Sequence, residues 1–406
     1  MKERCLYWLR DHRVLCGLWI IIGFVSAVTK LSPTRHNNYD IFRYVFYNTW
    51  NGESLYAQST DGGFWDINHY GPLFSLIIAP FAVMPVWMGM ILWCTLLAAF
   101  LYWAACKHCS LENTYSTKAV DGYSYIKPFM IWFCAHELLT ALFMQQFNVA
   151  IAGILLLSFY YVEKEKDQYA TLFIVIGTLV KLYGIVGIAF FFFSKHKLKY
   201  ILSLLGWSVL LVCLPMLISS PEYQLSQYQE WVQCLSEKND ENLLAMSQNI
   251  SLLGLVRKFG YNLTGDAWWA QSYQDIYLIL AGMITMAIGY FRIGQWKNPC
   301  FRHTVLAAVL MFVCLFSTGT ESSGYIIALI GCVIWYCAVP WKRTKLDVAL
   351  MTFAFILTSL SPSDLFPKYL KQEFVQPYAL KALPVAIIWI KLCYEFITKK
   401  YDTIKL

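Results

Sequence analysis

The chain has 406 residues, of which 58% are hydrophobic, 17% are aromatic and only 14% are charged. Soluble proteins carry about 25% charged residues, so this composition excludes an ordinary soluble enzyme. The net charge is +7, but the lysines and arginines occur in short clusters between apolar runs. Such clusters are typical of the cytoplasmic loops of membrane proteins. We therefore predict a multi-pass protein surrounded by membrane lipid, with no nucleic-acid partner.

The N-terminal end predicts the orientation of the chain. Several basic residues precede an apolar run at about 14–31. Positive charges accumulate on the cytoplasmic side of a membrane, so the N-terminus is expected there. No small-residue cleavage pattern accompanies the run, and no cleavable signal peptide is predicted.

The first external loop, predicted at 32–85, is polar and aromatic from His36 to Phe74. Its residues 71–84 are apolar, but they are fewer than the roughly 20 residues that a helix needs to cross a bilayer. Prolines also surround this stretch. We expect a short helix at the outer interface there rather than a crossing.

The apolar runs that follow alternate with basic clusters and predict the remaining crossings. They lie at 86–106, 126–144, 148–162, 168–182, a short run before the cluster at 195–199, 198–219, 275–292, 303–318, 323–340, 346–361 and 379–397. With the first run this makes about twelve crossings and places both termini in the cytoplasm. A second large external loop is predicted at 220–274. We treat residues 1–406 as a single, all-α membrane domain.

With these boundaries, a set of polar residues falls at the outer ends of the runs or in outer loops. The set is Asp40, Asp66, His69, Gln146, Asn148, Lys181, Tyr183 and Glu321. A charged group at the centre of a membrane helix costs about 2.5–3.5 kcal/mol and usually marks function. We therefore predict one site that faces outward.

The two aspartates of the first loop are the candidates for acid–base chemistry. Asp40 is suited to act as a general base that accepts a proton from an attacking hydroxyl. A helix cap or a salt bridge to Arg43 is the structural alternative. Asp66 precedes the interfacial helix and, with His69, would bind the acceptor or the donor phosphate. An Asx turn is its alternative.

The intramembrane polar residues also have two interpretations each. Lys181 interrupts an apolar run, where it would either neutralise a phosphate or extend its amine toward the membrane surface. Glu137, Gln146 and Asn148 would bind sugar hydroxyls or form a polar network between helices. Glu321 lies at the tip of a helical hairpin, where it would bind substrate or be solvated.

Several nucleotide-binding signatures are missing from the sequence. It has no GxGxxG, no P-loop and no DxD within a soluble domain, and no segment is long and polar enough to build a Rossmann domain. A sugar transferase whose site lies outside the cytoplasm has no nucleotide sugars available. It would instead need a lipid-phosphate donor.

Six segments in order resemble glycosyltransferase family 87. They are NNYDIFRYVFYNTWNGESLY, WDINHYGPLFSLIIAPFAVMP, HELLTALFMQQFNV, LVKLYGIVG, SQNISLLGLV and FSTGTESSGYIIALIG. They run from about residue 37 to residue 340, and their order and spacing are more specific than any one of them. The chain departs from the common pattern at Gly71, where another residue is more usual.

The resemblance implies a GT-C-type multispanning bundle in the plasma (inner) membrane. The better-known members of the family use polyprenyl-phosphate mannose and act on lipid-linked glycans at the outer face. By this resemblance Asp40 is the catalytic base of an inverting single displacement, and Lys181, with His69, stabilises the departing phosphate. Aromatic residues of the loop, Tyr70 among them, and Tyr183 would bind the sugar. No cofactor is expected; a divalent metal is left open but not indicated.

Two other functions remain open. A transporter or flippase of lipid-linked sugars would bind the same ligand without reacting, but it would predict internal repeats, and none is evident. A lipid-glycan ligase or polymerase would depend on Arg and His in its outer loops. The loop at 220–274 contains Arg257 and Lys258 but no histidine.

Overall fold

The computed structural model describes residues 8–32, 35–58, 66–111, 126–245, 247–271 and 273–401. Every regular element within these ranges is a helix, which confirms the all-α prediction. The contacts divide the chain into two compact units. The first comprises Met1–His108 and Ala141–Glu237, and the second comprises Cys109–Thr140 and Lys238–Leu406.

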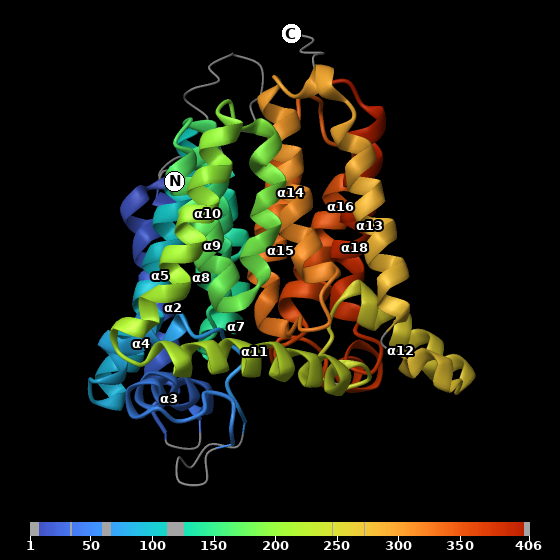
Figure 1. The fold of residues 1–406 in the computed structure, drawn as a ribbon. Helices are drawn as coiled ribbons and strands as arrows, with labels where there is room; N and C mark the ends of the chain where they lie inside the picture. Colours follow the sequence, from blue (N-terminus) through green and yellow to red (C-terminus); the bar gives the residue numbers. More distant parts are fainter. Residues whose placement is uncertain are drawn as a thin grey trace. The chain divides into compact units, whose positions relative to one another are not determined.

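The first unit is built around α8, a helix that is apolar on all sides and therefore buried. Its helices are α2 (His12–Val28), α3 (Asn37–Asn51), α4 (Phe74–Ala82), α5 (Val86–Cys109), α8 (Asn148–Glu163), α9 (Asp167–Lys181), the 3-10 helices η3 (Tyr183–Phe193) and η4 (Leu214–Leu217), α10 (Lys197–Cys213) and the beginning of α11 (Pro221–Asn242). Helices α9 and η3 pack against α8, and α10 packs against α9. In Figure 1 the long apolar helices run side by side, whereas α3 and α4 lie together at one end of this unit.

The second unit has the hairpin of α14 and α15 at its centre, with α18 packed against both. Its helices are α6 (Ile126–Phe133), most of α7 (Ala135–Phe143), α12 (Leu252–Thr264), η5 (Ala267–Ala270), α13 (Gln274–Tyr290), η6 (Ile293–Gln295), α14 (Pro299–Leu315), η7 (Ser322–Gly324), α15 (Tyr325–Cys337), α16 (Lys345–Phe353), the π-helix η8 (Ala354–Leu360), α17 (Lys368–Leu370), the π-helix η9 (Lys371–Val375), η10 (Leu380–Ala382) and α18 (Leu383–Thr398). The Asn298 side chain caps α14 by accepting hydrogen bonds from two backbone N–H groups of its first turn. Pro299 occupies the first position of the helix, where a backbone N–H would have no partner within the helix.

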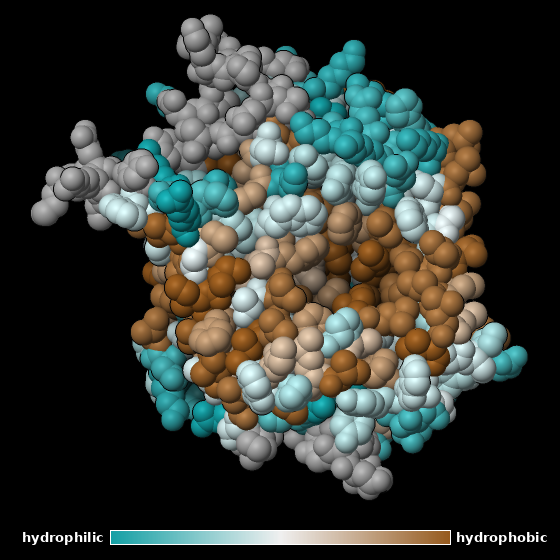
Figure 2. Space-filling model, turned by 90° about the vertical axis from the view of Figure 1, so that its left-hand side faces the viewer, coloured by the Kyte–Doolittle hydropathy of each residue, from teal (hydrophilic) through white to brown (hydrophobic). Residues whose placement is uncertain are grey.

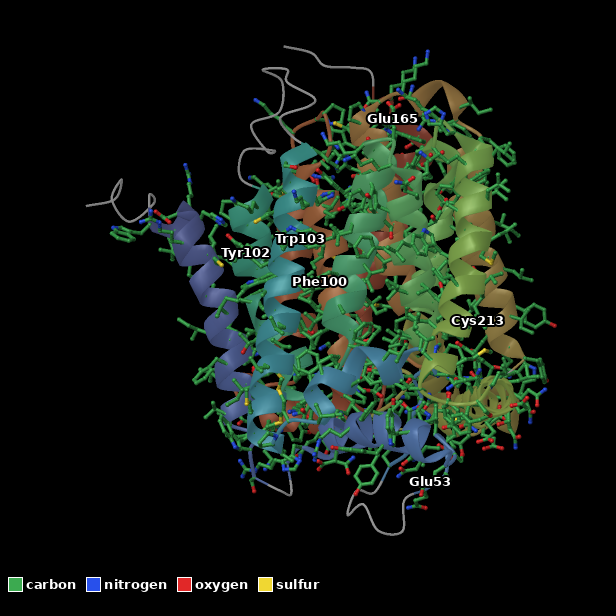
Figure 3. The ribbon with its side chains drawn as sticks, turned by 60° about the vertical axis from the view of Figure 1, so that its left-hand side comes forward. Glu53, Phe100, Tyr102, Trp103, Glu165 and Cys213 are labelled. Atoms are coloured by element: carbon green, nitrogen blue, oxygen red, sulfur yellow. The ribbon has the colours of Figure 1, made fainter. Side chains whose placement is uncertain are left out.

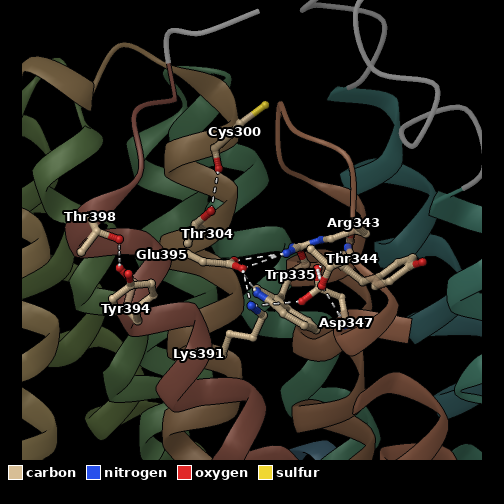
Figure 4. A network of polar contacts seen from close by, with 11 residues as sticks. Cys300, Thr304, Trp335, Arg343, Thr344, Asp347, Lys391, Tyr394, Glu395 and Thr398 are labelled. Carbon is tan, nitrogen blue, oxygen red and sulfur yellow. Dashed lines mark hydrogen bonds and ion pairs between the residues drawn. The ribbon is translucent and has the colours of Figure 1, made fainter. Parts of the chain in front are cut away.

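A network of charged side chains joins α15, α16 and α18 at one end of the second unit (Figure 4). Arg343 lies 3.1 Å from Glu395, and Lys391 contacts both Glu395 at 3.4 Å and Asp347 at 3.3 Å. The Trp335 indole donates a hydrogen bond to Glu395, whose side chain is almost fully buried. Two acids and two bases thus neutralise one another where the three helices meet.

Apolar side chains are exposed along several helices of the first unit, as expected for a surface in contact with lipid. Figure 2 shows them as a broad band between two hydrophilic ends on the face that it draws. Ile21, Phe24 and Leu96 are exposed although they belong to apolar helices of this unit. A surface of this kind is favourable in contact with the hydrocarbon chains of lipids and unfavourable in contact with water.

Among the described residues, two helices are long and apolar enough to cross a membrane, Val86–Cys109 and Lys197–Leu217. The pair α6 and α7, bent by 44°, would make a third if it counts as one span. Shorter apolar helices of 10–17 residues occupy His12–Val28, Asn148–Glu163, Tyr183–Phe193, Gln274–Tyr290, Pro299–Leu315 and Ser322–Cys337. The chain thus has helices suited to a membrane, but about twelve crossings are not confirmed by this criterion.

The structure differs from the sequence-based expectations in three places. Asp40 lies in the first turn of the helix α3 rather than in a loop. The loop predicted at 220–274 is mostly helical, because α11 and α12 occupy much of it. The run at 126–144 is two helices that meet at a bend instead of one continuous span.

Candidate functional site

Asp40 forms a close pair with His36 at the beginning of α3. The distance from His36 Nδ1 to Asp40 Oδ2 is 2.6 Å, and the side chains are 9% and 20% exposed. His36, not Asp40, occupies the N-cap position. Partial burial raises the pKa of Asp40, while His36 and, more weakly, Arg43 act to lower it. Asp40 is thus a half-buried carboxyl whose proton affinity is higher than that of an ordinary aspartate.

The start of α3 is anchored to the rest of the first unit by hydrogen bonds to backbone carbonyls. Tyr39 donates to Phe81 O at 3.0 Å, and Asn38 donates to Met144 O at 2.9 Å. Arg43 donates to Ala82 O and so holds α4. The close ion pair of Asp40 is with His36 and not with Arg43, which was the structural alternative. These bonds fix the position of the α3 backbone that carries Asp40.

A second group of predicted residues meets at the end of α9. The Tyr70 hydroxyl donates to Gln146 Oε1 at 2.6 Å, and Lys181 Nζ donates to the same oxygen at 3.3 Å. The Lys181 ammonium also lies over the rings of Tyr70 and Tyr183, 5.2 and 5.5 Å from their centroids. We call Tyr70, Gln146, Lys181 and Tyr183 the Tyr70 cluster. It combines a half-buried cation with aromatic faces and amide groups.

Tyr70 also connects this cluster to the helix that carries Asp40. Its ring stacks on Phe42 of α3, with centroids 5.0 Å apart, and its carbonyl accepts hydrogen bonds from Tyr56 and Asn68. Its hydroxyl accepts a hydrogen bond from the Phe147 backbone N–H at 3.1 Å. Asn148, the next residue, begins α8 and is buried. The base candidate and the cation candidate are therefore parts of one packed assembly within the first unit.

His69 precedes Tyr70 and is held by α11, and Asp66 lies beside His69. His69 Nε2 lies 3.8 Å from Asp66 Oδ1, while its Nδ1 lies 3.3 Å from Cys234 Sγ. Trp231 donates its indole N–H to the His69 carbonyl at 3.0 Å. Asp66 Oδ1 also accepts a hydrogen bond from the N–H of the next residue, Ile67.

The two ends of the first unit differ in chemistry. Figure 3 shows Glu53, which follows α3, at one end and Glu165 at the other, with Phe100, Tyr102 and Trp103 of α5 between them. Glu165 pairs with Lys195 at 2.6 Å in the region of basic clusters. Helix α9 starts two residues after Glu165 and ends at Lys181, so the Tyr70 cluster lies at the end away from those clusters.

Gly71 shows why the HYGP segment needs a glycine. A Cβ atom at this position would lie 2.0 Å from the Leu179 carbonyl oxygen and 2.8 Å from the Trp231 ring. The Gly71 N–H donates to Val180 O at 3.0 Å, one residue before Lys181. This close backbone contact is what brings Tyr70 beside Lys181.

We expect Gly71→Ala to destabilise the protein by about 1–3 kcal/mol or more, because overpacking forces the backbone contact apart. The measurement is the free energy of unfolding in detergent. Gly17→Ala is the matched control, since a Cβ there meets no atom within 4 Å. Equal stability of the two variants would contradict the contact at Gly71.

The other two predicted residues, Glu137 and Glu321, belong to the second unit. Glu137 is fully buried and pairs with Lys381 at 2.9 Å, and Lys381 also donates to Ser322. Glu321 is half-buried at the hairpin tip, where Ser323 donates to it at 3.5 Å. For Glu137 the contacts fit the structural alternative, a polar network between helices.

Among the described residues, no group of three or more His, Cys, Asp or Glu side chains is arranged to hold a metal ion. The expectation that no cofactor is needed stays a prediction.

The sequence-based prediction gave His36 no role, although its four-residue spacing from Asp40 can be read from the sequence. A histidine four residues before an aspartate lies on the same face of a helix, but the segment was assigned to a loop. The contacts of Trp231 and Cys234 with the first loop had no such signal, because more than 160 residues separate the partners.

The comparison with protein families gives one match. A family model described as glycosyltransferase family 87 matches residues 68–318, more than half of the chain. The matched stretch contains all of the Tyr70 cluster, whereas His36 and Asp40 precede it. Among curated proteins none matches the chain.

Proposed function

Because the chain belongs to glycosyltransferase family 87, we propose that it transfers mannose from a polyprenyl-phosphate donor to a lipid-linked or glycan acceptor at the outer face of the membrane. The family match supports a transferase that binds a sugar donor and an acceptor. The observation that supports the proposed donor is the position of Lys181 within the Tyr70 cluster, at the end of the first unit that also carries Asp40.

In this proposal Asp40 is the general base. The acceptor hydroxyl gives its proton to the carboxylate as its oxygen bonds to the anomeric carbon, and the bond from that carbon to the phosphate oxygen breaks. The electron pair leaves with the phosphate. The configuration at the anomeric carbon is inverted because the hydroxyl attacks from the face opposite the leaving phosphate. The hydrogen bonds that anchor α3 support this role, because a base must be held in place to act.

Lys181 is proposed to bind the departing phosphate. An ammonium acts as a compact point charge for a phosphate, and the attraction between the two charges is stronger where water is partly excluded. The amine is half-buried between two aromatic rings, which supports this assignment. His69 lies beside Tyr70 and would provide a second donor to the phosphate.

Gln146, Asn148, Tyr70 and Tyr183 are proposed to bind the sugar. Gln146 Oε1 already accepts hydrogen bonds from Tyr70 and Lys181, which leaves its amide Nε2 as the donor for a sugar hydroxyl. Asp66 is proposed as a further substrate contact. Glu137 and Glu321 belong to the second unit, where the fully buried pair of Glu137 with Lys381 is assigned to the polar network between helices.

The proposed topology has about twelve crossings in the plasma (inner) membrane and both termini in the cytoplasm. The separation of Lys195 and Glu165 from the Tyr70 cluster along α9 supports an outward-facing site.

The test of this function is sugar transfer in membranes that contain the protein. Membranes are supplied with radiolabelled polyprenyl-phosphate mannose, or with labelled nucleotide mannose, together with a total lipid extract. Transfer from the polyprenyl donor alone supports the proposal. Transfer from the nucleotide sugar alone would overturn the donor class, and donor binding without any transfer would favour a transporter of lipid-linked sugars.

We expect Lys181→Met to lower the rate of transfer from the polyprenyl donor by about 10²- to 10³-fold, because the variant loses one electrostatic contact to the leaving phosphate. The measurement is kcat with saturating acceptor. Lys199→Met, at an exposed lysine near the other end of the first unit, should retain the wild-type rate. A full rate for Lys181→Met would show that its amine serves packing alone.

A further inference from the structure

His36 is the one close polar partner that the structure gives the Asp40 carboxylate among the described residues. Their side chains are four residues apart, and the Asp40 backbone N–H donates to the His36 carbonyl at 3.1 Å. The imidazole therefore approaches the carboxylate from within the same helical turn. Both residues are partly screened from solvent.

We infer that His36 is the positioning residue of the general base: its Nδ1–H holds Asp40 Oδ2 and thereby presents Oδ1 to the acceptor hydroxyl. The inference rests on the proposed function and adds a residue that it does not contain. At a separation of 2.6 Å the imidazole must donate, because an ionised carboxylate only accepts. One oxygen is then fixed and the other remains to receive the proton.

The hydrogen bonds around the pair make this arrangement rigid. Tyr39 and Asn38, which lie between the two residues of the pair in sequence, are anchored to carbonyls at residues 81 and 144. A carboxylate held at one oxygen on an anchored helix has a single orientation. Loss of the His36 contact would let the carboxylate rotate, and a displacement of about 1 Å can lower a rate by about 10²-fold.

The charged groups around Asp40 allow the role of His36 to be detected in the pH dependence of activity. On α3, Arg43 and Tyr39 interact electrostatically with Asp40, and Tyr44 follows it by one helical turn. Cys94 of α5 interacts with Tyr39, and α4 has no titratable side chain. Activity requires ionised Asp40, so it falls as the pH decreases through the pKa of Asp40. Burial raises this pKa and His36 lowers it, so removal of His36 moves the acid limb to higher pH.

The experiment compares His36→Phe, which removes the donor, with His36→Asn, whose amide nitrogen replaces Nδ1. For His36→Phe we expect kcat to fall about 10- to 100-fold, KM for the donor to change little, and the acid limb of kcat/KM to move to higher pH. His36→Asn should regain most of kcat. Unfolding in detergent is measured for each variant, because only folded protein is compared.

The control is His196→Phe, which removes the exposed histidine near Glu165. It should leave both the rate and the pH profile unchanged. Wild-type rate and acid limb in folded His36→Phe would overturn the inference, as would equal losses in the Asn and Phe variants. Absence of transfer by the wild type would instead overturn the proposed function, so the two failures are distinguishable.

Discussion

Asp40→Asn is expected to reduce sugar transfer by about 10²- to 10⁴-fold, the contribution of a positioned general base. The asparagine keeps the shape of the side chain and accepts the hydrogen bond from His36, but it cannot take a proton from the acceptor. Donor binding should persist, because the Tyr70 cluster is unchanged. The measurement is kcat for mannose transfer from the polyprenyl donor, with binding of the labelled donor measured separately.

Glu53→Gln is the matched control for this variant. Glu53 is an exposed carboxylate that follows α3 at the same end of the first unit. Its neutralisation changes the local charge by the same amount without removing the proposed base. If Asp40→Asn folds and transfers sugar at the rate of Glu53→Gln, Asp40 is a structural residue, and Asp66→Asn becomes the variant to measure.

Lys381→Met is expected to cause the largest loss of stability, about 3–5 kcal/mol. The lysine is 3% exposed and its partner Glu137 is fully buried, so the substitution leaves an uncompensated carboxylate inside the second unit. The Ser322 carbonyl and hydroxyl also lose their donor. The measurement is the free energy of unfolding in mixed detergent micelles.

The double variant Glu137→Gln with Lys381→Met separates the cost of an unpaired charge from the value of the pair. It should recover much of the stability, because a neutral amide is far cheaper to bury than a lone carboxylate. Lys195→Met is the control: it breaks an ion pair that is exposed on both sides and should leave the unfolding free energy unchanged within error. A small effect of Lys381→Met would show that water reaches the Glu137 carboxylate or that the carboxyl group stays protonated and neutral.

The helices of this chain were largely predictable where they are apolar. The boundaries predicted at 86–106, 148–162 and 168–182 lie close to α5, α8 and α9, because a long apolar run has few alternatives to a helix. The long helix α11 was missed for the opposite reason. It is polar along most of its length, so hydropathy alone assigned it to a loop.

The sequence allowed several residues of the candidate site to be predicted, but not the contacts between them. Gln146 and Lys181 stood out as polar groups near apolar runs, and Tyr70 was named as an aromatic residue of the first loop. The structure brings the three within hydrogen-bonding distance. The partner of Glu137 could not be inferred, because Lys381 lies 244 residues further along the chain. The first turn of α3 was assigned to a loop because its mixed polar and aromatic residues lack a clear apolar stripe, and this hid the pair of His36 and Asp40.

The 3-10 helix η3 has a consequence for the bilayer next to the site. Its 11 residues extend about 22 Å in this form, against about 17 Å as an α-helix, while the hydrocarbon core is about 30 Å thick. If η3 crosses as proposed, neighbouring lipids must shorten or tilt to match it. In that topology Lys181 and Tyr183 would stand at its outer end, and the headgroup layer there would be drawn inward. A carrier lipid that diffuses along this helix would thereby have its phosphate lowered toward the lysine without leaving the membrane.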